Sequence, residues 1–432
     1  MLLNYSRELT GRELHPIAIF AILSLMNQES QGVPVVPEKK PRFGNVFYVG
    51  LLSFFGGISQ DIFVPILPLY LEQVLGLNKS FIGFTEGIVK ASASIFKIIS
   101  GYLSDKFPRA NKKIIFAGYF LSMVSRPLLA LAGSAAAVST LRFLDGFGKG
   151  IKDAPKDALI AGSSEKKTRG KSFGIARALD TLGSVVGPIL LFFLLKALID
   201  NPLKYHYILF LATIPLVFTL LILIFKVKEN QVPPVEKKVL SLPLPRNFYL
   251  FLVVMSVFTI GNFSDAFLIL RAENVGLSIL AIPLVYALFN LFYAGASIPL
   301  GSLSDKIGRE KVILIGFLAY GLAYTGFAFA TTGLHVAVLF AFYGIYFATT
   351  EGVAKAFIAD LVPIERRGRA YGIYNASLGA LALPASFIAG FLWDKYGPPA
   401  TFGFGAVMAV IAAVLLVVFL RFFKKQEDLA VV

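Results

Sequence analysis

Twelve apolar segments of bilayer length place the strongest constraint on the fold of this chain. A transmembrane α-helix needs about 20 consecutive, mainly apolar residues. Hydrocarbon cannot satisfy exposed backbone groups, and the sequence lacks the ten-residue alternation of a membrane β-barrel. The sequence therefore predicts an all-α membrane protein with twelve transmembrane helices. The segments cover residues 47–72, 80–103, 112–132, 134–157, 172–198, 205–225, 247–270, 280–303, 311–331, 333–357, 370–393 and 399–421.

The composition agrees with a membrane protein and disfavours other classes. Hydrophobic residues make up 56% of the chain and charged residues 16%, against roughly 45–50% and about 25% in soluble domains. The formal net charge of +15 comes from Lys and Arg in short loops, a pattern that orients membrane proteins rather than binding nucleic acid. The chain has no Cys, and its three His lack the spacing of metal ligands, so we expect neither a metal site nor a disulfide.

A polar, proline-rich interval divides the apolar segments into two sets of six. We expect six-helix bundles over 47–225 and 247–424, a cytoplasmic linker over 226–246, a cytoplasmic extension over 1–46 and a tail over 425–432. The basic residues gather after the second, fourth, eighth and tenth segments, in the linker and near the C-terminus. This asymmetry predicts that both termini are cytoplasmic, in the inner membrane of a prokaryote.

One loop sequence occurs twice. "GYLSDKFPR" (101–109) ends the second segment, and "GSLSDKIGR" (301–309) ends the eighth. Six segments separate the copies, so both face the same side. "ALIAGSSEKKTRGKSFGI" (158–175) likewise aligns with "AFIADLVPIERRGRAYGI" (356–373). The chain therefore contains a duplicated six-helix unit, and two like-oriented halves fit a transporter with a midplane site between them.

These loops carry a family resemblance that extends over nearly all the chain after residue 46. "GSLSDKIGR" resembles the loop signature of the major facilitator superfamily, and the first copy differs from that signature at Pro108. "RFLDGFGKG" (142–150) resembles the Arg-x-x-x-Gly pattern of the fourth helix. "GSVVGP" (183–188) resembles an element of the drug–proton antiporter branch, although "ILLF" follows in place of that branch's further glycines. The resemblance implies the two-bundle fold of that superfamily and secondary transport.

The repeated loop predicts a cytoplasmic gate. Its glycines permit close helix approach, its aspartates can face the positive end of a neighbouring helix, and its arginines offer a fork to a carboxylate. Plain topogenic charge is the alternative. The predicted gate residues are Gly101, Asp105, Arg109, Gly301, Asp305 and Arg309.

Ionisable side chains inside the membrane are costly, and their presence indicates function. A buried carboxylate can carry a proton between two water-exposed faces, while a nearby Arg or Lys pairs with its ionised form. We expect Glu86 and Lys90, four residues apart, to pair. Asp145 with Arg142 and Asp180 with Arg177 are the leading coupling pairs, and purely structural ion pairs are the alternative. The candidates for proton coupling are Asp61, Glu86, Lys90, Lys97, Arg142, Asp145, Arg177 and Asp180.

The remaining candidates concern the substrate cavity and helix packing. The second half has fewer charges and more aromatic residues, so we expect it to shape the cavity, although packing is an equally ordinary role for aromatic rings. The candidate cavity residues are Asp265, Asn290, Tyr293, Glu351 and Asn375. Gly183, Gly187 and Pro188 are predicted to pack helices, and Pro65 and Pro68 to bend the first one.

The sequence thus predicts a secondary active transporter that works by rocker-switch alternating access. Proton-coupled export of small organic compounds is the expected activity, and import by a proton symporter or facilitator is the alternative. A membrane sensor and a lipid-modifying enzyme are remoter possibilities, since hydrolase, zinc and phosphate-loop motifs do not occur. We expect a monomer that needs no cofactor beyond the proton gradient, with a small-molecule substrate, protons and the bilayer as its partners.

Overall fold

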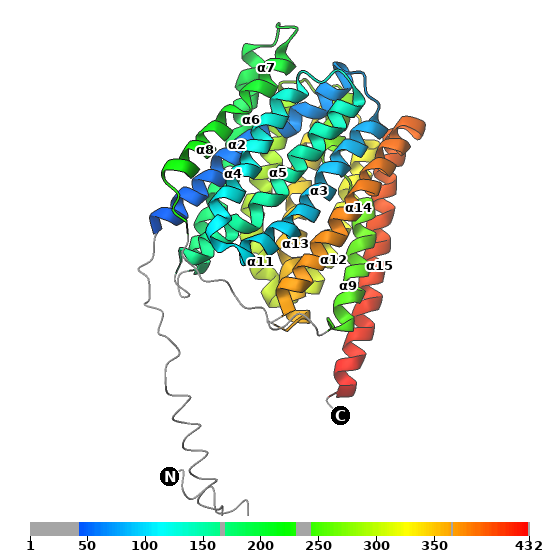
Figure 1. The fold of residues 1–432 in the computed structure, drawn as a ribbon. Helices are drawn as coiled ribbons and strands as arrows, with labels where there is room; N and C mark the ends of the chain where they lie inside the picture. The colour runs from blue at the N-terminus through cyan, green and yellow to red at the C-terminus, as the bar shows by residue number, and fades with distance from the viewer. Residues whose placement is uncertain (1–42, 165–168, 230–242, 364–365, 431–432) are drawn as a thin grey trace, which may run out of the picture. The chain divides into compact units, whose positions relative to one another are not determined.

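The computed structural model describes residues 43–164, 169–229, 243–363 and 366–430. Over these ranges the chain forms helices and loops, and Arg42–Val432 is one compact unit (Figure 1). The predicted extension lies outside the described residues up to position 42, and so does most of the linker. Of the twelve spans in the described ranges, nine are apolar enough to cross a membrane by hydropathy and length; α3, α4 and α5 are the more highly charged remainder.

Ten of the predicted spans are single helices and two are broken. The single helices are α2 (Phe43–Gln73), α3 (Lys79–Lys106), α4 (Asn111–Leu129), α5 (Ala135–Gly162), α6 (Arg169–Ala197), α11 (Ala281–Ile307), α12 (Arg309–Phe329), α13 (Gly333–Leu361), α14 (Arg367–Tyr396) and α15 (Pro398–Ala430). The sixth span consists of α7 (Lys204–Leu211) and α8 (Ile214–Phe225), and the seventh of α9 (Arg246–Gly261) and α10 (Ala266–Asn274). α2 continues through both Pro65 and Pro68.

The break in the seventh span differs from the continuous helix predicted over 247–270. Its sequence, "GNFSD" (261–265), contains Gly and small polar residues that compete with helical hydrogen bonds. Side chains replace the lost backbone bonds: the Tyr320 hydroxyl donates to the carbonyl of Gly261 at 2.6 Å, and the backbone N–H of Ser264 donates to the Ser386 hydroxyl at 3.2 Å. The break is therefore a stable feature of the second bundle.

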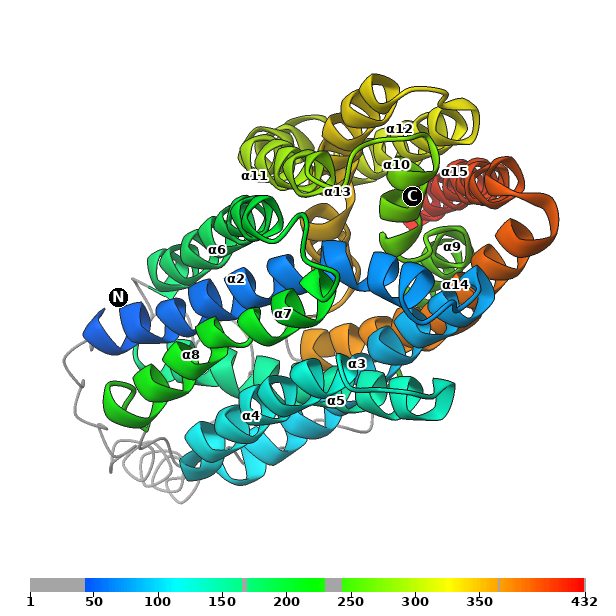
Figure 2. The ribbon, with the colours of Figure 1, turned by 90° about the horizontal axis from the view of Figure 1, so that it is seen from above.

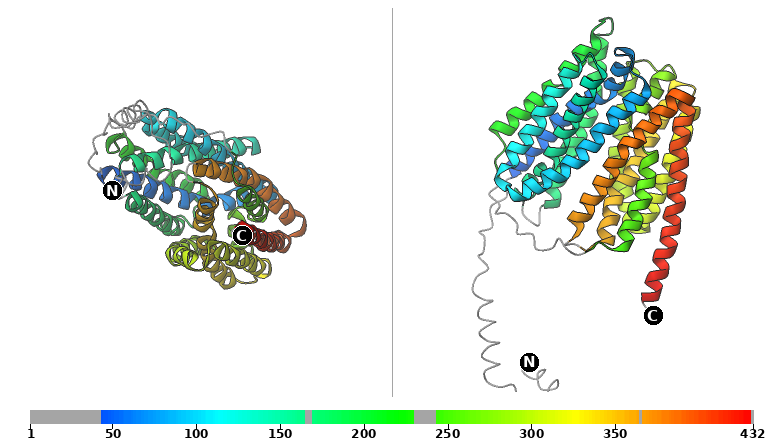
Figure 3. Two further views of the ribbon diagram at one scale, coloured as in Figure 1. Left: turned by 90° about the horizontal axis from the view of Figure 1, so that it is seen from below. Right: turned by 45° about the vertical axis from the view of Figure 1, so that its right-hand side comes forward.

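The same helix contacts occur in both halves. The first span packs on the fifth and sixth (α2 on α6 and α8), and the seventh packs on the eleventh and twelfth (α9 on α14 and α15). The fourth span contacts the second and third (α5 on α3 and α4), as the tenth contacts the eighth and ninth (α13 on α11 and α12). The structure therefore confirms two pseudo-symmetric six-helix bundles, which occupy the blue-to-green and green-to-red parts of the ribbon in Figure 3.

Two pseudo-equivalent helix pairs join the bundles. α3 packs against α14 and α6 against α11, as Figure 2 shows from above. The duplication exchanges these pairs, because the second and eighth spans correspond, as do the fifth and eleventh. The bundles thus meet on two sides of a central region. In the predicted alternating access, one bundle would move against the other along these two contacts.

Glycines bring α3 and α14 into backbone contact. A methyl group on Gly83 would collide with the carbonyl oxygen of Ser386, and one on Gly390 would collide with that of Lys79. A methyl group on Gly87 would lie 2.5 Å from the Cα of Leu383. Small residues stabilise helix pairs in lipid by allowing such close van der Waals contact.

The aromatic residues of the second bundle form its core. Tyr320, Tyr324, Tyr343 and Tyr346 are almost completely buried and lie against the ring of Phe258 or one another. Burial of this kind favours the packing interpretation of the aromatic stretch "FYGIYF" (342–347) over a cavity surface. The cavities lined by polar and charged residues therefore lie outside this aromatic core.

The substitution Gly83→Ala tests the glycine contact. Overpacking of this kind costs about 1–3 kcal/mol, so we expect a lower melting temperature for the purified protein in detergent. Gly372→Ala is the matched control on α14, where nothing lies within 4 Å of the added methyl group. It should be neutral or stabilising by up to about 1 kcal/mol. Equal melting temperatures for the two variants would contradict the close contact.

Candidate substrate and proton site

Five charged residues of the first bundle meet in a buried cluster, called here the central charge cluster. Asp145 on α5 is fully buried and contacts three cations: Lys149 at 2.8 Å, Arg126 at 3.2 Å and Arg142 at 3.5 Å. Arg142 also pairs with Glu86 on α3. Three cations thus surround two carboxylates, and the cluster holds one surplus positive charge.

Residues of α2 complete the coordination of Arg126. Its guanidinium donates to the Ser59 hydroxyl at 2.6 Å and to the Gln60 side-chain oxygen at 2.7 Å. The ring of Phe63 lies 5.1 Å from the guanidinium carbon of Arg126 and 5.6 Å from that of Arg142. Every nitrogen of the Arg126 guanidinium therefore has a partner, as a buried charge requires.

The structure brings three of the eight predicted coupling residues into the cluster and keeps the predicted pair of Arg142 with Asp145, but it changes the partner of Glu86. Glu86 pairs with Arg142 and not with Lys90, which is exposed. Arg142 attracts the carboxylate of Glu86 more strongly than Lys90 does, because Arg142 is buried on the neighbouring helix and water screens its charge less. Lys97 finds a partner on α5, 3.6 Å away at Asp153.

Arg126 is a cluster member that sequence reasoning missed. It stands in the third span within "SMVSRPLL" (122–129), where a lone Arg before a proline was a visible signal. A charged residue inside a span faces the bundle interior. The identity of its partner follows only from the packing of α4 on α5.

Asp61 lies beside the cluster and lines a cavity of about 430 Å³ among α2, α4, α5 and α6. Its side chain is almost buried, and within the described part of the chain no Lys or Arg nitrogen lies within 4.0 Å of its carboxylate. Hydroxyl groups approach it instead, from Ser184 on α6 and from Tyr286 on α11 of the other bundle.

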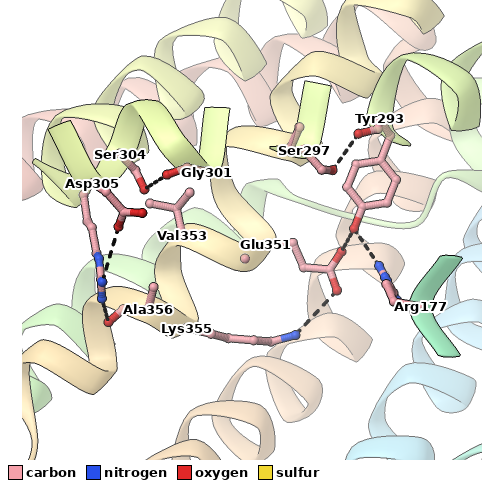
Figure 4. Close-up of a pocket in the computed structure, with 13 residues that line it drawn as sticks. Arg177, Tyr293, Ser297, Gly301, Ser304, Asp305, Glu351, Val353, Lys355 and Ala356 are labelled. Carbon is pink, nitrogen blue, oxygen red and sulfur yellow. Dashed lines mark hydrogen bonds and ion pairs between the residues drawn. The ribbon is translucent and has the colours of Figure 1, made fainter. Parts of the chain in front are cut away.

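A second cavity, of about 570 Å³, lies between α6, α11 and α13 (Figure 4). Arg177 pairs with Asp180 at 3.2 Å, as predicted, and donates to the Tyr293 hydroxyl at 2.8 Å. That hydroxyl donates to Glu351 at 2.6 Å, and Lys355 lies 3.5 Å from the same carboxylate. A polar chain therefore runs from α6 of one bundle to α11 and α13 of the other, with Asp180 also lining the first cavity.

The other cavity candidates lie apart from this polar chain. The Asn290 amide donates to the carbonyl of Ser184 at 2.9 Å, which ties α11 to α6. Asp265 accepts from the Tyr343 hydroxyl at 2.9 Å at the break of the seventh span. Asn375 is half-buried on α14.

The glycines predicted to pack helices do contact a neighbouring helix. A methyl group on Gly183 would collide with the carbonyl oxygen of Phe54 on α2, and one on Gly187 would lie 2.9 Å from that of Ile58. Pro188 continues the same stretch of α6. This close approach holds α6 against the segment of α2 that carries Asp61.

The predicted gate residues make no described contact between the bundles. Arg309 lies 3.5 Å from Asp305 and 2.8 Å from Asp360 on α13, all within the second bundle. Gly301 has open space around its Cα, and Arg109 is exposed. Gly101 is in ordinary contact with Ala154 on α5. The side chain of Asp105 lies outside the described residues, so its role stays a prediction.

The family assignment follows from the sequence match. The profile of the Major Facilitator Superfamily matches residues 49–269 and 247–430. The chain belongs to the major facilitator superfamily. A transporter of that type from Methanocaldococcus jannaschii, itself uncharacterised, is 38% identical over 382 residues, which is 86% of this chain and 94% of that protein.

Other relatives of this transporter are more distant. The quinolone resistance protein NorA of Staphylococcus aureus is 30% identical over 143 residues, which is 33% of this chain and 36% of NorA. Among solved structures, the POT family transporter PepTSo matches with a TM-score of 0.74 at 13% identity, over 90% of this chain and 99% of that one. The nucleoside transporter NupG (D323A mutant) matches with a TM-score of 0.71 at 14% identity, over 88% and 99%. These structures establish the shared fold.

Removal of Arg126 tests whether the central charge cluster holds the transporter together. Loss of one partner from a buried ion pair costs about 3–5 kcal/mol, so Arg126→Ala should unfold at a markedly lower temperature than the parent protein. Arg177→Ala is the matched control, because its side chain is 58% exposed and an exposed pair contributes about 0–1 kcal/mol. Similar thermal unfolding of both variants in detergent would show that the cluster is not a stabilising element.

Proposed function

We propose that this transporter moves a small organic compound by alternating access and couples the movement to protons through Asp61. The proposal is carried by one observation: Asp61 is a nearly buried carboxylate that lines a cavity without a cation at salt-bridge distance in the described residues. Such a group can gain or lose a proton without breaking an ion pair. The hydroxyl groups near Asp61 come from both bundles, so a movement of one bundle against the other would change its surroundings.

The same reasoning assigns a different role to Asp145. Protonation of Asp145 would remove its ion pairs with Lys149, Arg126 and Arg142 at the same time. An uncompensated buried charge costs several kcal/mol, so this carboxylate stays ionised through the cycle. We therefore place Asp145 as the organiser of the cluster, and Asp61 as the residue that titrates.

Asp180 is the second proton-coupling residue in this proposal. Arg177 divides its hydrogen bonds between Asp180 on its own helix and Tyr293 on the other bundle. A tilt of the bundles would stretch the contact with Tyr293 and return Arg177 wholly to Asp180. The ion pair of Asp180 would then differ between the two states, and coupling requires such a difference.

The contacts between the bundles support alternating access. At the end of the molecule opposite the repeated loops, Asp394 on α14 accepts from the backbone N–H groups of Lys79 and Ser80, at 3.0 and 2.7 Å. A carboxylate at the N-terminus of α3 is favoured by the helix dipole. Gln73 and Glu273 are joined nearby at 3.1 Å. This end is closed by polar contacts that water can replace, so it can also open.

Export by proton exchange is the direction we propose, supported by the partial similarity to a quinolone resistance protein. The second candidate is cotransport of a substrate with a proton. One observation favours it: the surplus positive charge of the central charge cluster would hold an anionic substrate best when Asp61 is protonated. In exchange, by contrast, substrate and proton compete for the cavity.

The substitution Asp61→Asn tests the coupling. Transported compounds are first identified by a growth screen of an overexpressing strain against quinolones and organic acids. We then expect flux in proteoliposomes to depend on an imposed pH gradient for the parent protein and to lose that dependence in Asp61→Asn, because the amide cannot ionise. Asp200→Asn, at an exposed position between α6 and α7, is the control and should behave as the parent. Full gradient dependence of Asp61→Asn would remove this assignment and leave the transporter in place.

A reversible cross-link tests alternating access. The chain has no Cys, so the double variant Gln73→Cys, Glu273→Cys carries the only thiols. Oxidation should join α2 to α10, hold the closed end shut and stop transport, and a reductant should restore it. Each single variant, treated with the same oxidant, should transport normally. Undiminished flux through the cross-linked protein would show that this end does not open during the cycle.

A further inference from the structure

Three lysines line one wall of the first cavity. Lys149, Lys152 and Lys156 all belong to α5 and face this cavity. Their spacing of three and four residues places them on one face of the helix, and the helical rise separates the first and last Cα atoms by about 10 Å. The row leads from the central charge cluster toward the end of the molecule that carries the repeated loops.

The lysines of this row share their carboxylates with other cations. Lys149 shares Asp145 with two arginines. Lys152 lies 3.5 Å from Asp153, but Lys97 lies 3.6 Å from the same carboxylate. Each group therefore holds more cations than carboxylates. With Asp61 and Asp180 included, the cavity lining has four cations and three carboxylates, so one surplus positive charge remains.

Of the three lysines in this row, Lys156 has the fewest partners among the described residues. It is half-buried, and none of the described carboxylate oxygens lies within 4.0 Å of its ammonium nitrogen. Asp153, Asp157 and Asp180 act on it from a longer distance, and two of these are already paired, with Lys152 and Arg177 respectively. A partly desolvated ammonium in a cavity favours an anion.

We propose that the first cavity binds an organic anion, with Lys156 as the first contact for its carboxylate or phosphate group and Lys152 and Lys149 as the next contacts inward. This inference rests on the proposed function, in which substrate passes through this cavity, and it names the substrate class; an anionic substrate favours the cotransport form of that function. A cleft lined by surplus charge of one sign concentrates ions of the opposite sign. The surplus on the α5 wall thus selects anions over cations of similar size.

Charged thiol reagents test the field of the cavity directly. Ala93→Cys places a single thiol in the cavity lining, and Ser278→Cys places one at an exposed site in the loop between α10 and α11 as the reference. We measure the labelling rate by the anionic sulfonatoethyl methanethiosulfonate relative to the cationic trimethylammonioethyl reagent. This ratio at Ala93→Cys, divided by the ratio at Ser278→Cys, should exceed one by a factor on the order of ten. It should fall toward one at high salt.

Substitutions at Lys156 test whether this residue produces the positive field of the cavity. Lys156→Gln in the Ala93→Cys protein should lower the normalised ratio by roughly three- to tenfold, whereas Lys156→Arg should keep it. Lys79→Gln, which removes a lysine from the opposite end of α3, should leave the ratio unchanged. A normalised ratio at or below one, or a ratio insensitive to Lys156→Gln, would overturn the proposal.

Small probes then distinguish the two anion types. Benzoate, phenyl phosphate and benzylamine share an aromatic ring and differ in charge. Slower labelling of Ala93→Cys with benzoate indicates a carboxylate substrate, and slower labelling with phenyl phosphate indicates a phosphate. Protection by benzylamine alone, or by neither anion, would contradict the proposal. Because labelling needs no pH gradient, this result stands apart from the outcome for Asp61→Asn.

Discussion

The buried contact between Asp145 and its three cations is the interaction on which the structure of this transporter depends. Charges inside a membrane protein are tolerated only when they are paired and shielded from lipid. Asp145 draws Arg126 from α4 and both Arg142 and Lys149 from its own helix, while Arg142 engages Glu86 on α3. The charged faces of three helices, α3, α4 and α5, are thereby held in the interior of the first bundle. The position of the cavity beside Asp61 follows from that packing.

The two bundles use different physical means for the same architecture. The first bundle places ion pairs at its centre, and the second places stacked tyrosines there, with Asp265 held by Tyr343 at the helix break. Both solutions give buried polar groups partners on neighbouring helices, such as Asp145 for Arg126 and Gly261 for Tyr320. In the proposed mechanism the charged centre keeps Asp145 ionised, and Asp61 beside it carries the proton. The glycine contact of α3 with α14 and the polar chain from Arg177 to Glu351 join the two bundles.

The polar contacts that join the bundles at one end are reversible, because water can replace them. Asp394 occupies the N-terminus of α3, and its partners are backbone N–H groups that water could serve equally well. The repeated loops at the other end make their described contacts within one bundle, through Arg309 and Asp360. Among the described residues, polar contacts thus join the bundles at one end, and the repeated loops at the other end do not join them. The proposed alternating access requires such a difference between the two ends.

The sequence by itself determined the twelve spans, the duplication and the set of charges inside the membrane, because span length and hydropathy are local properties and a repeat is visible in one dimension. It also placed Arg177 beside Asp180 and Arg142 beside Asp145, which are neighbours along one helix. Only the tertiary structure decided that Glu86 pairs with Arg142 and not with Lys90, that Arg126 joins the cluster, and that Asp61 has no cation at salt-bridge distance among the described residues. These facts depend on the rotation and depth of one helix against another, and a difference of one residue in either would exchange the partners.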